Sequence, residues 1–194
     1  MRRQTVLTAL IFGAALTVAY TFSGAQQAQI PTLQASNKTA AKGRATVFIQ
    51  SRKDPAHAGT FTVSLDGGVT FDPLTADYPT FVGHPKIIVD MVDSVKGTVV
   101  LETVEQATTT GKYGATVYLS GRCKIDPVDQ PGQPTDPPKG CRYWLMIADN
   151  KGQDNNKDGT PDIISFLVFN KAGKRVAHGT GPVREGDIKV AAGD

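Results

Sequence analysis

The sequence predicts an all-β fold: a single-domain antiparallel β-sandwich, or a partly open barrel, of about eight or nine short strands. Three observations lead to this prediction. Apolar and polar residues alternate in several short runs, as in strands with one buried face, and glycine-containing turn signals separate these runs. In addition, no stretch keeps a helical period over several turns before a Gly, a Pro or a β-branched run interrupts it.

The first strands are predicted from the alternation itself. In residues 60–66, Phe61, Val63 and Leu65 fall on one face of an extended chain. Three further runs alternate in the same way, through Ala45, Val47 and Ile49, through Ile87, Val89 and Met91, and through Ala115, Val117 and Leu119. Turn signals at residues 66–68, 96–97 and 110–112 separate these strands.

Two later runs, residues 143–148 and 163–169, are apolar at nearly every position. They predict strands that are covered on both faces, or that lie centrally with one face under a loop. Residues 171–174 then predict a short hairpin into a strand at 175–178, and residues 187–190 predict the last strand. The sequence shows neither an internal repeat nor a second domain.

Residues 124–140 hold five prolines and lie between the two cysteines, Cys123 and Cys141. Because proline removes backbone donors, this segment predicts an extended surface loop. An even cysteine pair in an exported chain predicts a disulfide, which stabilises by about 3 kcal/mol in the chain-entropy model. The strands at 113–120 and 142–148 are then expected to be antiparallel neighbours.

The N-terminus predicts export. Arg2 and Arg3 precede an apolar run, and small residues at Ser23 and Ala25 suit a signal peptidase that cuts after Ala25. A membrane anchor is the alternative, but polar residues follow the run where a basic stop-transfer cluster is expected. The predicted organisation is a signal peptide at 1–25, a flexible tether at 26–42 and the β-domain at 43–194, with a secreted, extracellular or periplasmic location.

Charge excludes one class of partner. Removal of residues 1–25 takes Arg2 and Arg3 away, so the formal net charge falls from +3 to +1. The remaining Lys and Arg residues are scattered, with no basic stripe, so nucleic acid is not an expected partner. Because the apolar run is expected to be cleaved off with the signal peptide, no membrane is an expected partner of the mature form. A surface protein or a polysaccharide remains open as a partner, and so does the oligomeric state.

A calcium loop is the most distinctive motif. Oxygen-bearing residues recur at alternate positions of residues 154–162, with Gly159 at the sharp turn, as a cation that takes six to eight oxygen ligands requires. The predicted ligands of a structural Ca²⁺ are Asp154, Asn156, Asp158, Thr160 and Asp162. The pattern resembles the loops of thrombospondin type 3 repeats and dockerins.

The motif is not a complete EF-hand, because Ser165 stands where the bidentate Glu belongs and the flanking segments are strand-like. Asp149 or Asn150 is expected to supply the remaining oxygens. Extracellular sites of this kind bind with Kd of order 10⁻⁴ to 10⁻³ M. The competing interpretation is an ordinary exposed turn, since Asp, Asn and Gly are common in turns.

No catalytic or cofactor-binding residue is predicted, and an enzyme is not expected. His57, His84 and His178 are isolated in the sequence and predict solvated positions, although a fold can bring such residues together. No serine or cysteine lies in a nucleophile motif. Aromatic residues offer one alternative, a sugar-binding surface, but core packing is the expected use of Trp144, Tyr143, Tyr118 and Tyr113.

Residues 115–121, 143–150, 166–173 and 186–190 follow a pattern of a strand, an aromatic strand ending in Asp149-Asn150, a strand ending in Phe169-Asn170 and a final strand. This pattern resembles the secreted bacterial β-domain called post-COAP-1, and residues 43–49 are similar to its first strand. The resemblance implies a secreted all-β module and carries no established activity. The long turn after Asn150 and the proline-rich loop depart from the family pattern.

Together these features predict a secreted structural or adhesive β-domain of the cell surface or extracellular space. A carbohydrate-binding module is the first alternative. A hydrolase or inhibitor whose site is assembled from loops is the second.

Overall fold

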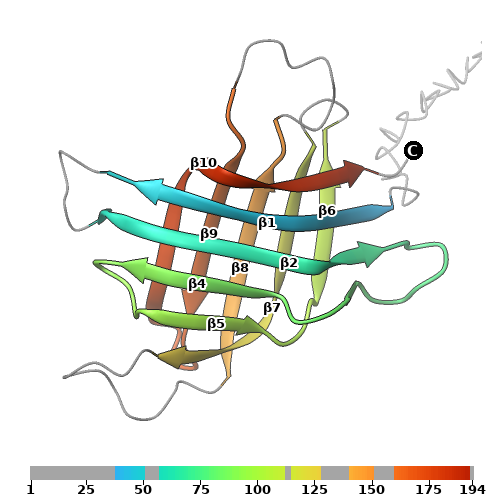
Figure 1. The fold of residues 1–194 in the computed structure, drawn as a ribbon. Helices are drawn as coiled ribbons and strands as arrows, with labels where there is room; N and C mark the ends of the chain where they lie inside the picture. The colour runs from blue at the N-terminus through green and yellow to red at the C-terminus, as the bar shows by residue number, and fades with distance from the viewer. Residues whose placement is uncertain (1–37, 51–56, 112–114, 128–139, 151–159, 193–194) are drawn as a thin grey trace, which may run out of the picture. The chain divides into compact units, whose positions relative to one another are not determined.

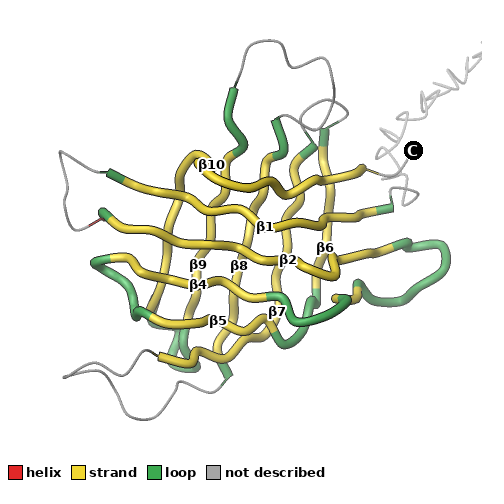
Figure 2. Tube along the Cα trace, in the orientation of Figure 1, coloured by secondary structure: helices red, strands yellow, loops and turns green. Residues whose placement is uncertain are grey.

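The computed structural model describes residues 38–50, 57–111, 115–127, 140–150 and 160–192, all within one compact unit, Gln34–Asp194. These residues form strands and turns without an α-helix (Figures 1 and 2). The strands are β1 (Thr39–Ile49), β2 (Gly59–Phe71), β3 (Thr80–Phe81), β4 (Lys86–Met91), β5 (Gly97–Leu101), β6 (Gln106–Thr110), β7 (Thr116–Pro127), β8 (Cys141–Ala148), β9 (Ile163–Phe169) and β10 (Arg175–Ala192).

The strands form one antiparallel sheet that closes on itself. The order is β1-β10-β9-β8-β7-β5-β4-β2, and β2 pairs with β1 to complete a ring of eight strands. Strand β6 adds to β7 beside β5, and β3 adds to the end of β2. The predicted all-β antiparallel fold is confirmed, and the barrel alternative describes it better than the sandwich does, because the ladder returns to its first strand.

Two long strands turn the corners of this closed sheet. Strands β1, β2, β4 and β5 cross in front of β7, β8 and β9, and β10 passes from one layer to the other (Figure 1). The first part of β10 pairs with β9 as far as Pro182, and the remainder pairs with β1 from Val183 onward. Strand β7 pairs with β8 from Thr116 to Cys123 and with β5 from Cys123 to Pro127.

A glycine permits the corner in β10. The β1–β10 pairing shifts by one residue here, because Thr46 faces Glu185 whereas Val47 faces Val183. Gly186, which follows Glu185 in β10, has φ of 78°. A side chain there would be strained, and its Cβ would lie 2.2 Å from the carbonyl oxygen of Arg44. The bulge therefore depends on glycine.

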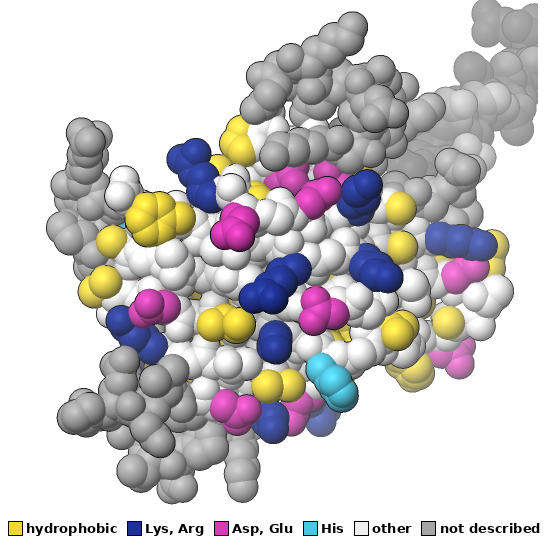
Figure 3. Space-filling view, in the orientation of Figure 1, with side chains coloured by type: hydrophobic (Ala, Val, Ile, Leu, Met, Phe, Trp, Pro, Cys, Tyr) yellow, Lys and Arg dark blue, Asp and Glu magenta, His cyan; other side chains and the backbone are white. Residues whose placement is uncertain are grey.

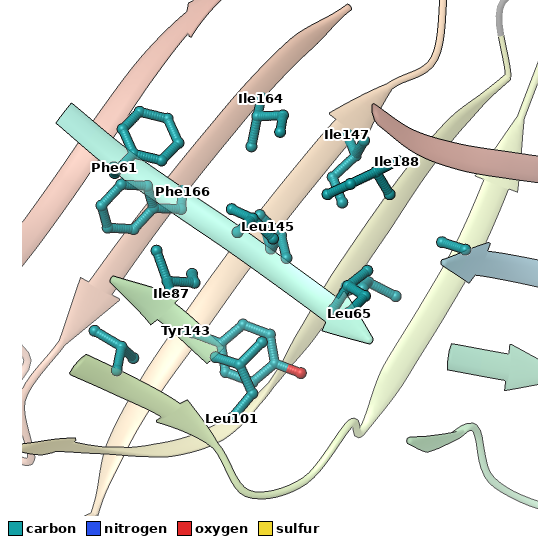
Figure 4. Packing of buried hydrophobic residues seen from close by; sticks show 14 of the residues in the cluster. Phe61, Leu65, Ile87, Leu101, Tyr143, Leu145, Ile147, Ile164, Phe166 and Ile188 are labelled. Atoms are coloured by element: carbon teal, nitrogen blue, oxygen red, sulfur yellow. The ribbon is translucent and has the colours of Figure 1, made fainter. Parts of the chain in front are cut away.

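The interior of the closed sheet is a packed apolar core, seen in Figure 4. The rings of Phe61 and Phe166 meet edge to face from opposite layers, with centroids 4.8 Å apart. Gly179 makes room for this pair, because a Cβ at that position would lie 2.7 Å from the Phe61 ring. Tyr143 is fully buried, and its hydroxyl donates a 2.9 Å hydrogen bond to the carbonyl oxygen of Thr103.

Strand boundaries depart from the sequence prediction in three places. Strand β1 begins at Thr39, inside the predicted tether, because pairing with both β2 and β10 buries its small side chains. The predicted turn at residues 66–68 is a bulge within β2, where Gly68 has φ of 92°. The predicted strands 175–178 and 187–190 belong to one strand, β10.

Two other expectations are corrected. Residues 124–127 belong to β7, because Lys124, Ile125 and Asp126 pair with β5 even though Pro127 ends the strand. Strands β8 and β9 are not covered on both faces, since burial alternates along each of them. Their outer faces lie over no other described layer, so the apolar residues there remain partly exposed. By contrast, the predicted hairpin at 171–174 and the antiparallel pairing of β7 with β8 are confirmed.

The predicted signal peptide at 1–25, most of the tether and the proline-rich residues 128–139 lie outside the described residues. Within the described ranges, no helix has the length and apolar character needed to cross a bilayer.

The described core predicts that alanine substitutions of Phe166 and Phe48 lower the stability of the protein by different amounts. Phe166→Ala removes a fully buried ring and should lower the free energy of unfolding by about 3–5 kcal/mol. Phe48→Ala, on the outer face of β1, should cost less than about 1 kcal/mol. Urea denaturation followed by circular dichroism measures both. Equal losses for the two variants would contradict the described core.

Candidate metal centre

Three aspartates from three segments meet at one end of the closed sheet. Asp149 follows β8, Asp162 precedes β9, and Asp187 lies in the part of β10 that pairs with β1. Each offers a carboxylate oxygen, and these oxygens all lie within 4.8 Å of one another. Asp149 and Asp162 are each only 1 % exposed, whereas Asp187 is open to solvent.

Backbone donors hold the two buried carboxylates in place. The amide of Val190 donates a 2.9 Å hydrogen bond to Asp149 Oδ2, and the amide of Asn150 donates one of 2.9 Å to Asp162 Oδ1. The chain around them is also fixed, since Asp149 N donates to Ala115 O and Val183 N donates to Asp162 O. These hydrogen bonds hold Asp149 and Asp162 in fixed positions relative to the strands.

The other oxygen of Asp149 identifies this cluster as more than an exposed acidic patch. Oδ1 is buried and has no hydrogen-bond partner among the described residues. A buried carboxylate is stable when it is paired or when it coordinates a metal ion. Two oxygens that bind one calcium ion at 2.3–2.6 Å lie at most about 5 Å apart, so separations within 4.8 Å suit a shared ion.

The structure locates two of the five predicted calcium ligands. Asp162 lies in the cluster, and Thr160 is exposed two residues before it. Asp154, Asn156 and Asp158 lie outside the described residues. Asp149, expected as an additional ligand from the strand end, is part of the cluster. Asp187 was missed, because its only sequence signal is a single aspartate in a predicted strand.

The predicted disulfide is not present in this structure. Cys123 and Cys141 face each other in the β7–β8 ladder and are buried, but no bond joins their sulfurs. Directly opposed strand residues lie about 4.5–5.5 Å apart at Cα, which suits a disulfide. A disulfide also needs a Cβ–S–S–Cβ dihedral near 90°, however, so pairing in the ladder does not by itself form the bond.

Figure 3 shows the outside of the layer formed by β1, β2, β4 and β5. On this face, basic and acidic side chains are interspersed, and hydrophobic side chains lie singly between them. The charges therefore produce no field of one sign here. This face has the character of an ordinary solvated surface.

The outer face of β7 and β8 is different. Trp144 is 58 % exposed and Tyr118 is 48 % exposed, so core packing was the wrong expectation for both. A depression of about 490 Å³ lies between them, and Gln106, Thr108, Ser120 and Ser165 supply its polar lining. Tyr143 is buried on the opposite face, and Tyr113 lies outside the described residues.

The histidines are not all isolated. His57 and His178 converge on Asp93, whereas His84 is an exposed loop residue, as expected. The sequence gives no signal for this convergence, because the three residues lie on segments far apart in the chain.

Comparisons with protein-family models, curated proteins and solved structures find no match to this chain. The similarity to post-COAP-1 domains therefore stays a prediction.

The burial of both cysteines predicts that their thiols react more slowly in the folded protein than in the unfolded protein. Burial raises the pKa of both the Cys123 and the Cys141 thiols, so little reactive thiolate forms near pH 8. In protein prepared without reductant, a thiol reagent should react slowly with the native chain and rapidly with two thiols in denaturant. An unfolded chain without reactive thiols would show that the disulfide forms after all.

Proposed function

We propose that this chain is an exported structural or adhesive β-domain that binds calcium at the Asp149–Asp162–Asp187 site. The observation that carries the proposal is the buried Oδ1 of Asp149, which has no hydrogen-bond partner in the described part of the chain and lies beside two further carboxylates. An all-oxygen ligand set favours a hard cation such as Ca²⁺ over softer transition metals. The extracellular medium predicted for the chain supplies this ion in abundance.

A bound cation would reduce the electrostatic repulsion among the three carboxylates. Three carboxylates within 4.8 Å repel one another, and two of them are removed from water. A divalent cation offsets this repulsion and bonds the ends of β8 and β9 to the second half of β10. The loop between Asn150 and Thr160 begins and ends beside the same site, so the ion would also fix both ends of that loop.

A carbohydrate-binding role is the second candidate, and the exposed aromatic pair favours it. Trp144 and Tyr118 flank a depression lined by hydroxyl and amide side chains. Apolar rings that stack on a sugar face, together with polar groups that bond its hydroxyls, form a suitable site for a polysaccharide. The Trp144 ring is also held in place by Phe169, with centroids 5.7 Å apart.

Calcium should stabilise the folded protein. If Kd is of order 3 × 10⁻⁴ M, 10 mM calcium stabilises by about 2 kcal/mol, which raises Tm by about 4–8 °C. Asp149→Asn should remove this shift, because the amide keeps an acceptor for Val190 N but loses the charge. Scanning calorimetry with and without calcium measures the shift, and isothermal titration gives Kd.

Asp77→Asn is the matched control, because Asp77 is an exposed loop residue far along the chain from the site. It should respond to calcium as the wild type does. Folded wild-type protein that shows neither heat nor a Tm shift at 10 mM calcium would refute the calcium site. A calcium-induced Tm shift that survives in Asp149→Asn but is lost in Asp158→Asn would show that residues 154–162 bind the ion without Asp149.

The carbohydrate candidate predicts binding that depends on Trp144. On a glycan array, the wild type should retain a defined set of sugars, and Trp144→Ala should weaken binding by roughly 2- to 13-fold, equivalent to loss of about 0.5–1.5 kcal/mol of stacking. Tyr78→Ala is the control, because Tyr78 is an exposed ring outside the depression. A folded wild type that binds no glycan would remove this candidate.

A further inference from the structure

A second group of metal-ligating side chains lies apart from the carboxylate cluster. His57 Nδ1 is 2.5 Å from Asp93 Oδ2, and His178 Nε2 is 2.9 Å from the same oxygen. The two imidazole rings stand edge to face with centroids 5.4 Å apart. One nitrogen from each ring therefore lies beside the same carboxylate oxygen, and these three atoms are all within 4.8 Å of one another.

The backbone holds the three segments together before any ligand arrives. His57 lies two residues before the start of β2, Asp93 lies in the turn between β4 and β5, and His178 is in β10. The amide of Val92 donates to the carbonyl oxygen of Ala58 at 3.0 Å, which joins the first two segments.

The turn that carries Asp93 is also fastened to β10. The amide of His178 donates to Ser94 Oγ at 3.1 Å, and the Ser94 hydroxyl donates back to the carbonyl oxygen of His178 at 3.3 Å. The amide of Val95 donates to the carbonyl oxygen of Val176 at 2.8 Å. Side chains supported in this way keep their mutual position, which is the requirement for a preformed metal site.

We propose that His57, Asp93 and His178 form a site for a divalent transition-metal ion of the zinc class, independent of the calcium site. Two imidazole nitrogens and one carboxylate oxygen are a ligand set that such ions favour, and three protein ligands leave a fourth position for water or another ligand. Calcium is a poor occupant here, because it prefers oxygen ligands.

The separations of the three ligand atoms are compatible with one shared ion. Ligand atoms at about 2.0–2.1 Å from a tetrahedral zinc lie roughly 3.3 Å apart. The two separations from Asp93 Oδ2 are 2.5 and 2.9 Å, and the three ligand atoms all lie within 4.8 Å of one another, so the side chains must move apart around Asp93 Oδ2 to admit the ion. The side chain of His57 is 51 % exposed, which leaves a path from solvent, whereas those of Asp93 and His178 are largely covered.

Zinc binding to the intact purified protein tests the proposal. The protein, prepared without a polyhistidine tag and stripped with a chelator, is titrated with ZnCl₂ by calorimetry. We expect one zinc ion per chain, and His57→Ala should weaken binding by about 10-fold or more, since even partners outside the ligand set cost 10- to 100-fold. His178→Ala should act in the same direction. Co²⁺ in place of zinc should give a visible absorption spectrum that reports nitrogen and oxygen coordination.

His84→Ala is the matched control, because it removes the third histidine, which lies in an exposed loop, and should leave zinc binding unchanged. Asp149→Asn should also leave it unchanged, which separates this site from the calcium site. Circular dichroism establishes that each variant is folded, and the more exposed His57 provides the variant least prone to unfold.

A folded wild type that takes up no zinc would overturn the proposal. So would a His57→Ala variant that binds as tightly as His84→Ala. In either case the three side chains form a hydrogen-bonded triad only.

Discussion

Closure of the sheet is the constraint on which the rest of the structure depends. Strand β1 pairs with β2 on one side and with β10 on the other, so the ladder of the eight-stranded ring returns to its first strand. A ring of eight strands encloses a space just wide enough for side chains to fill. The Phe61–Phe166 contact and the buried Tyr143 occupy that space, and Gly179 and Gly186 let the backbone come close enough to close it.

The same closure explains why β10 contributes to both candidate metal sites. Its first half pairs with β9 and carries His178, and its second half pairs with β1 and carries Asp187. Because the strand passes from one layer to the other, its two halves meet different neighbours. One half meets an aspartate and a histidine, which suit a transition metal, and the other meets two buried carboxylates, which suit calcium.

Much of the fold could be predicted from the pattern of residues, because each strand has one apolar face. Phe61, Val63 and Leu65 were predicted on one face of a strand, and all three are buried. The residue pattern gave wrong predictions where strand pairing had a stronger effect than local composition. Gly67 and Gly68 form a bulge in a continuing strand, since a neighbouring strand on each side holds β2 extended. The run in β8 is apolar on both faces, yet Trp144 is exposed, because no described layer covers that side.

The sequence by itself determined the class of fold and the interior residues of most strands, because these depend on local period. Only the tertiary structure decided the closure of the sheet, the pairing of Cys123 with Cys141 in one ladder and the membership of both metal-ligating clusters. Asp187 joins Asp149, and His57 joins His178, across large distances in the chain. Contacts of that kind follow from which strands pair, and strand pairing is a property of the whole sheet that no short stretch of sequence records.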